Sequence, residues 1–122
     1  MKPFTVNGDV WRVARVTPGS PSLIDKTGEF RLATTDPGNH TVYIQEDLKP
    51  PLVDKVLLHE VAHAVAVSYD LIDSLREIAP ETFWDAIEEW AVQMVEKYGI
   101  EAAEAASVSL GRPICVGGYC HD

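Results

Sequence analysis

Residues 56–67, with the sequence VLLHEVAHAVAV, decide the fold of this chain. The segment contains neither Gly nor Pro, and its only polar side chains are His59, Glu60 and His63. A helix that is apolar on every side lies inside a protein. Burial of two imidazoles and a carboxylate costs several kcal/mol unless each group has a partner. We therefore expect a buried helix whose three polar side chains are kept for a function.

The spacing of these polar residues indicates a metal ion. His59 and His63 are four residues apart, so their rings lie one turn apart on the same helix face and can bind one ion. Glu60 projects beside them, where it can take a proton from a water at the metal. This is the H-E-x-x-H pattern of zinc hydrolases. A solvated face would continue with polar residues, but Val, Leu and Ala stand at the neighbouring turns.

A catalytic zinc ion needs a third protein ligand and keeps a fourth position for water. Metzincins use a His six residues after the second one, but this chain has Tyr69 there, which excludes that class. Gluzincins take a Glu from a following helix, where this chain has Glu88 and Glu89. The helical neighbours of Glu88 are all apolar, whereas those of Glu89 include polar and acidic residues. We therefore expect Glu88 to face the core as the third ligand, with Glu89 as the alternative.

The residues before the motif indicate β structure. Three short strands are expected, at Val10–Val16, Phe30–Thr34 and Thr41–Gln45, because β-branched and aromatic residues are frequent or alternate there. Turn residues such as Asp36-Pro37-Gly38-Asn39 separate them. We expect a three-stranded, mostly antiparallel sheet, with Thr41–Gln45 beside the metal site.

Helical patterns follow Lys49-Pro50-Pro51, since prolines can begin a helix but cannot lie inside one. The first helix is expected over residues 52–68 and carries the H-E-x-x-H motif. The second is expected over residues 81–98, where apolar residues recur at three- and four-residue spacing, and it carries the third ligand. A short, alanine-rich third helix is expected over residues 100–110.

Length and composition allow one domain. The chain has 122 residues, of which 46% are hydrophobic and 24% are charged, as in a globular protein with one modest core. We expect a single α+β domain, a small zincin-like fold in which the sheet packs on the motif helix and the second ligand-bearing helix. It is β-rich over residues 1–48 and helical over 51–110, and it ends in a flexible tail over 111–122.

The negative charge of the chain is concentrated in its second half. Ten Lys and Arg against nineteen Asp and Glu give a net charge of −9, and residues 1–50 carry six of each sign. Such a surface repels phosphate groups, so we expect no nucleic-acid partner and no anionic membrane, but a protein or peptide substrate of basic character. No signal peptide or membrane span is expected, which favours a cytoplasmic location.

Around the motif the chain resembles the ImmA/IrrE-type metallopeptidases, especially their short stand-alone versions from phages and mobile elements. The resemblance covers roughly residues 31–99 and includes Val56-Leu57-Leu58 before the motif and Glu88-x-x-Ala91-x-x-Met94-Val95 after it. It implies a minimal gluzincin fold, a zinc ion and cleavage of a protein substrate, in well-known members a transcriptional repressor. The family carries Asn or Asp four residues after the ligand Glu, where this chain has Val92 or Gln93, so the third ligand stays open.

Two functions are therefore expected. The first is a zinc-dependent endopeptidase with Glu60 as the general base, and the second is a catalytically weak or inactive interaction module in which zinc joins two helices. The motif alone also allows hydrolysis of a non-peptide amide. The sequence offers four residues for stabilising an oxyanion without choosing between them: His40, Tyr43, Tyr69 and Tyr98.

The C-terminal segment offers a weaker metal signal. Cys115, Cys120 and His121 lie close together, but a single C-x4-C pair followed by one His is a poor zinc pattern. In a reducing compartment we expect the two cysteines to be free thiols.

Overall fold

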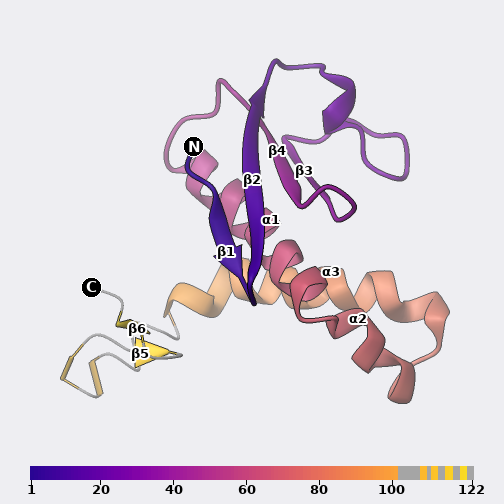
Figure 1. Cartoon of the computed structure of the whole chain (residues 1–122), viewed down its shortest axis with the longest axis vertical. Helices are drawn as coiled ribbons and strands as arrows, with labels where there is room; N and C mark the ends of the chain where they lie inside the picture. Colours follow the sequence, from indigo (N-terminus) through magenta and orange to yellow (C-terminus); the bar gives the residue numbers. More distant parts are fainter. Residues whose placement is uncertain (102–107, 110, 113–114, 117–118, 121–122) are drawn as a thin grey trace.

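The computed structural model describes residues 1–101, 108–109, 111–112, 115–116 and 119–120. Its α+β fold consists of a four-stranded mixed sheet, the long helix α1 (Leu52–Ser68), which lies against the sheet, and the helix α3 (Trp84–Met94), which crosses α1 on its other side (Figure 1). Among the described helices none is long and apolar enough to cross a membrane.

The sheet has the strand order β1-β2-β4-β3. Its strands are β1 (Phe4–Val6), β2 (Asp9–Val16), β3 (Ala33–Asp36) and β4 (Thr41–Gln45). β1 pairs with β2 and β3 pairs with β4 in antiparallel fashion, whereas β2 and β4 are parallel. The chain returns after β2, so β3 runs opposite to β2. The tight turn after β3 reverses the chain again, so β4 runs parallel to β2. The expectation of three mostly antiparallel strands was therefore wrong in the number of strands and in the central pairing.

The strand β1 was not expected from the sequence, although the sequence contains a signal for it. Asn7 and Gly8 join β1 to β2 and have φ angles of 48° and 82°. Asn-Gly is the preferred two-residue hairpin loop, since both positions need positive φ. β3 also begins later than expected, because Phe30 pairs only with Ile24, in an isolated bridge before the strand.

The helical half contains several short elements besides α1 and α3. They are α2 (Leu71–Ser74), η2 (Leu75–Glu77), η3 (Glu81–Phe83) and the π-helical η4 (Val95–Gly99). The strands β5 (Cys115–Val116) and β6 (Tyr119–Cys120) pair near the end of the chain, and η1 (Pro21–Leu23) follows β2. The first helix has the expected bounds.

The second helical segment does not end before Gly99. Helical backbone continues through η4 to Ile100 and Glu101, so no break separates it from the start of the expected third helix. An isolated Gly is tolerated inside a helix at a cost of about 1 kcal/mol, which packing of η4 against α1 can offset. Residues 102–107 and 110 of the expected third helix lie outside the described residues.

The core forms where α1 meets the sheet. Trp11 of β2, Val42 of β4 and Ala64 of α1 are fully buried and pack together. The Trp11 indole N–H donates a hydrogen bond of 2.8 Å to Oγ of Ser68, at the end of α1. Most other apolar side chains of α1 are only half-buried, so the helix is less enclosed than its sequence predicts. The reason is that, among the described residues, single helical elements (α2, α3 and η4) and no second sheet pack on the rest of its surface.

We predict that Trp11→Ala lowers the free energy of unfolding by about 3–5 kcal/mol, because it empties the centre of the core and leaves Ser68 without its donor. Trp90→Ala is the matched control, since this Trp is 66% exposed, and it should change stability by less than about 0.5 kcal/mol. Urea denaturation of both variants measures the difference, and equal effects would contradict the core described above.

Candidate metal centre

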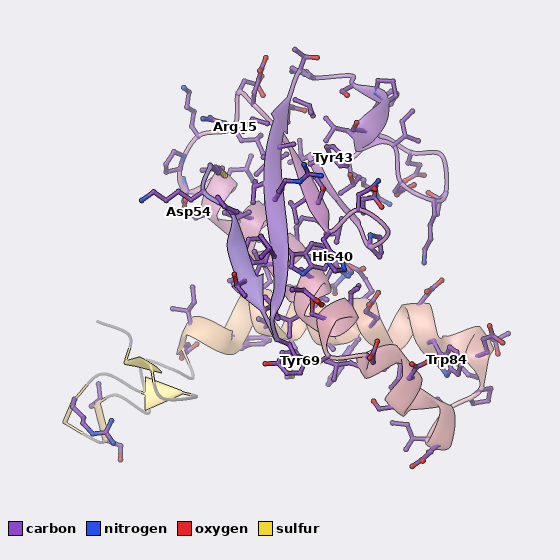
Figure 2. The ribbon with its side chains drawn as sticks, in the orientation of Figure 1. Arg15, His40, Tyr43, Asp54, Tyr69 and Trp84 are labelled. Carbon is purple, nitrogen blue, oxygen red and sulfur yellow. The ribbon has the colours of Figure 1, made fainter. Side chains whose placement is uncertain are left out.

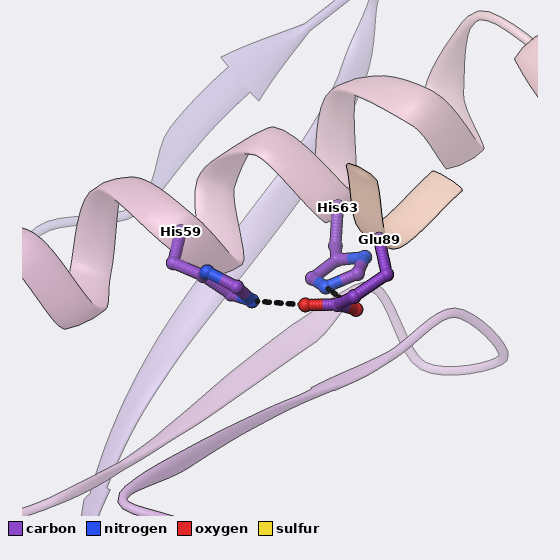
Figure 3. Close-up of side chains that lie close together, drawn as sticks. All are labelled: His59, His63 and Glu89. Carbon is purple, nitrogen blue, oxygen red and sulfur yellow. Dashed lines mark ion pairs between the residues drawn. The ribbon is translucent and has the colours of Figure 1, made fainter. Parts of the chain in front are cut away.

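The two motif histidines face α3 across the helix interface. Their rings lie one turn apart on α1, with centroids 5.1 Å apart. Nε2 of His59 lies 3.1 Å from Oε1 of Glu89, and Nε2 of His63 lies 3.3 Å from Oε2 of the same carboxylate (Figure 3). The Glu89 carboxylate of α3 therefore contacts both imidazoles at their Nε2 atoms.

The donor set and the spacing of this group fit zinc. The ligand atoms of His59, His63 and Glu89 all lie within 4.8 Å of one another. Tetrahedral zinc with bonds of 2.0–2.2 Å separates its ligand atoms by about 3.3–3.6 Å, close to the two His–Glu distances. The group is partly open to solvent, since the Glu89 side chain is 45% exposed, so a water or a substrate can reach it. These three residues could hold a zinc ion with one open position.

Glu88, the expected third ligand, occupies a different place. Its Oε2 lies 3.5 Å from Nδ1 of His63, on the other side of that ring from Glu89. The geometry thus favours Glu89 over Glu88 in the metal-binding group. The apolar helical neighbours of Glu88 correctly indicate that it is more enclosed, with 20% exposure. A catalytic ion must also bind water and would therefore lie at the rim of the core. Glu89 is the more exposed of the two carboxylates and reaches that position.

A third carboxylate from the same helical segment completes the surroundings of the histidines. Oε2 of Glu96, on η4, lies 3.0 Å from Nδ1 of His59, and Oε1 lies 3.7 Å from Nζ of Lys55. The hydrogen bond to His59 and the charges of His59 and two lysines lower the pKa of Glu96 despite some burial. Sequence reasoning missed this residue. Its spacing of seven from Glu89, which returns to the same helix face, was the available signal.

Glu60 is buried between α1 and the sheet. It is 8% exposed, and Oγ1 of Thr35 donates a hydrogen bond of 2.6 Å to its Oε2. Glu60 directly follows His59 in α1, and its negative charge contributes to the raised pKa of His63. Thr35 belongs to β3, and the expected neighbour, Thr41–Gln45, is the interior strand β4. β3 is the edge strand next to β4, and its Thr35 donates the hydrogen bond to Glu60.

The residues considered for an oxyanion site belong to different segments of the chain, and Figure 2 labels three of them, His40, Tyr43 and Tyr69. The His40 ring stacks on Trp11 with a centroid distance of 4.7 Å, which makes it a packing residue. Tyr69 follows the last residue of α1 and is 53% exposed, and Tyr98 on η4 is also exposed. Tyr43 lies in β4, where it is half-buried.

The C-terminal pair of cysteines is separate from the histidine group. Cys115 and Cys120 are paired residues of the β5–β6 ladder. His121 lies outside the described residues, so the expected weak C-x4-C-H signal gains no support from a neighbouring ligand.

We predict that Glu89→Gln lowers zinc affinity far more than Glu88→Gln does. The first change alters the carboxylate that lies close to both Nε2 atoms. The second alters only the carboxylate close to Nδ1 of His63. Loss of a group that orients a metal-binding histidine typically costs about 10–100-fold in metal affinity, and loss of a ligand itself should cost more. Titration with zinc against a chromogenic chelator measures both. The reverse order would restore Glu88 as the third ligand.

Zinc binding should weaken as pH falls. Burial lowers the pKa of His63, but the neighbouring carboxylates of Glu88, Glu60 and Glu89 outweigh this and raise it above its ordinary value. The protonated ring cannot bind metal, so protons compete with zinc at a higher pH than for a free imidazole. Below the raised pKa, affinity should fall by at least about tenfold per pH unit. Chelator competition between pH 5.5 and 8.5 measures this, and a flat profile would contradict His63 as a ligand.

Comparison of the chain with protein-family models, with curated proteins and with solved structures gives no match. The resemblance to ImmA/IrrE-type metallopeptidases therefore rests on the H-E-x-x-H motif and the helical pattern after it, and it stays a prediction.

Proposed function

We propose that this protein is a zinc-dependent endopeptidase in which His59, His63 and Glu89 bind Zn2+ and Glu60 is the general base. The observation that carries the proposal is the convergence of both Nε2 atoms on one carboxylate, at 3.1 and 3.3 Å. Two imidazoles and a carboxylate form a ligand set of catalytic zinc sites that leave a fourth position for water. The buried Glu60 next to them supplies the acid–base group that hydrolysis requires.

Glu60 has surroundings suited to proton transfer. The hydrogen bond from Thr35 holds one carboxylate oxygen, which fixes the orientation of the group. The other oxygen takes the proton of the attacking water and passes it to the nitrogen of the departing amine. When bound, zinc would polarise the scissile carbonyl and lower the pKa of a water ligand to about 7.

The position of β3 favours an extended peptide as the substrate. β3 is an edge strand of the four-stranded sheet, so one side of its backbone lies without a neighbouring strand among the described residues. Extended peptides bind such edges through main-chain hydrogen bonds. Because Thr35 of β3 contacts Glu60, a peptide along this edge would bring its backbone to the general base.

The charge of the chain favours a basic substrate. Residues 51–122 carry thirteen acidic and four basic side chains, and a zinc ion would change the net charge only from −9 to −7. An acidic surface attracts basic proteins, and the rate of their association falls with added salt. DNA-binding repressors, which the resemblance implies as substrates, are of this type.

A structural zinc ion is the second candidate function. Glu89 bridges from α3 to two side chains of α1, so an ion there would join the two helices. The fully buried apolar residues are few, and a bound metal stabilises a small domain whose core is modest.

Glu60→Gln separates the two candidates. The amide cannot accept the proton, so cleavage of a fluorescein-labelled basic protein and of a mixed peptide pool should fall by about 100–10,000-fold. Zinc content and melting temperature should stay close to those of the parent, because Glu60 is not a ligand. Glu46→Gln, which removes an exposed carboxylate after β4, is the control and should leave cleavage unchanged.

Three outcomes would contradict the proposal. Zinc well below one ion per chain, not restored by added zinc, would exclude both candidates. Bound zinc with no cleavage by the parent protein would favour the structural ion. Equal cleavage by the parent and Glu60→Gln would show that another residue is the base.

A further inference from the structure

Each histidine of the candidate centre has carboxylates on both of its ring nitrogens. The Nε2 atoms of His59 and His63 share Glu89, whereas their Nδ1 atoms face two different residues, Glu96 and Glu88. The two Nδ1 contacts are unequal. The His59–Glu96 distance is 3.0 Å, within hydrogen-bond range, whereas the His63–Glu88 distance is 3.5 Å.

The chemistry of the His59–Glu96 contact determines which nitrogen of His59 is available to a metal. An ionised carboxylate only accepts hydrogen bonds, so Nδ1 of His59 must be the donor. With its proton on Nδ1, the ring would present the lone pair of Nε2 to an ion bound between this atom and Glu89, which lies 3.1 Å away. Carboxylate partners of this kind fix the tautomer and the ring orientation of metal-binding histidines.

The surroundings of Glu96 hold its carboxylate in place. Its side chain is only 11% exposed, and its second oxygen lies 3.7 Å from Nζ of Lys55, which precedes His59 by one turn on α1. Glu96 lies in η4, whose π-helical turn packs against α1, and π-helical turns occur frequently at functional sites. Gln93, which follows Glu89 by one turn, is exposed to solvent. The residue two turns after Glu89 therefore reaches His59.

We propose that Glu96 is a positioning residue of the metal centre, whose carboxylate accepts a hydrogen bond from Nδ1 of His59 and thereby directs Nε2 at the bound ion. This role rests on the proposed zinc site and adds a residue to it. Lys55 supports the arrangement by orienting the carboxylate from its other side.

Zinc affinity and the binding mode of His59 test the proposal. Glu96→Ala should weaken zinc binding by about 10–100-fold in chelator competition, because the ring loses its orienting acceptor. Glu96→Gln should recover a large part of this loss, since its side-chain carbonyl still accepts from Nδ1. Glu81→Ala removes an exposed carboxylate at the start of η3 and should stay within twofold of the parent.

Long-range 1H–15N spectra of the zinc-loaded proteins give the second measurement. In the parent and in Glu96→Gln, His59 should show a protonated Nδ1 and a metal-shifted Nε2, whereas Glu96→Ala should show a second binding mode or exchange broadening. A residue that only stabilised the fold would not change this pattern. The melting temperature of each metal-free variant checks that the fold is intact.

The outcomes separate this role from the proposed function. Zinc binding by Glu96→Ala within threefold of the parent would overturn the positioning role and leave the zinc site intact. Equal losses in Glu96→Ala and Glu96→Gln with unchanged nitrogen spectra would show that only the charge of Glu96 acts, and would also overturn it. Absence of zinc binding by the parent would instead overturn the proposed function and this role with it.

Discussion

Two imidazoles on a largely apolar helix are the constraint on which the helical half of this protein depends. His59 and His63 lie between α1 and α3, where each ring nitrogen needs a hydrogen-bond partner or a metal. One continuous helical segment supplies all of these partners, since Glu88, Glu89 and Glu96 reach the two rings from α3 and η4. These contacts join α3 and η4 to α1 at all four ring nitrogens of the two histidines.

The sheet holds the same helix from the other side. Trp11 is fully buried against α1, and its hydrogen bond to Ser68 ties the end of the helix to β2. Thr35 ties the middle of the helix to β3 through Glu60. The motif residues thus lie between two supports, a rigid sheet and a helix bearing carboxylates. Such a pair of supports is what precise orientation of metal ligands requires.

The unequal distribution of charge has a partly local explanation. Four of the thirteen acidic residues in the second half, Glu60, Glu88, Glu89 and Glu96, gather around the two histidines or beside them. A divalent cation would offset part of this charge, and the ion pair with Lys55 offsets more. The remaining acidic side chains bear on which partners approach the protein, since their field extends over about 8–10 Å in physiological salt.

The sequence by itself determined the α+β class, the bounds of α1 and the convergence of His59 and His63, because these depend on local periodicity and on residues one turn apart. It did not determine the first strand, for which the Asn7-Gly8 signal was overlooked, or the parallel pairing of β2 with β4. Only the tertiary structure brought Glu89, rather than Glu88, close to both Nε2 atoms and placed Glu96 and Thr35 beside the motif residues. The physical reason is that these contacts join separate elements, and they depend on the rotation and the axial position of α3 and β3 relative to α1. Consecutive residues lie about 100° apart around a helix, so the rotation of α3 determines which of two adjacent carboxylates faces the histidines, and local sequence preferences do not specify that rotation.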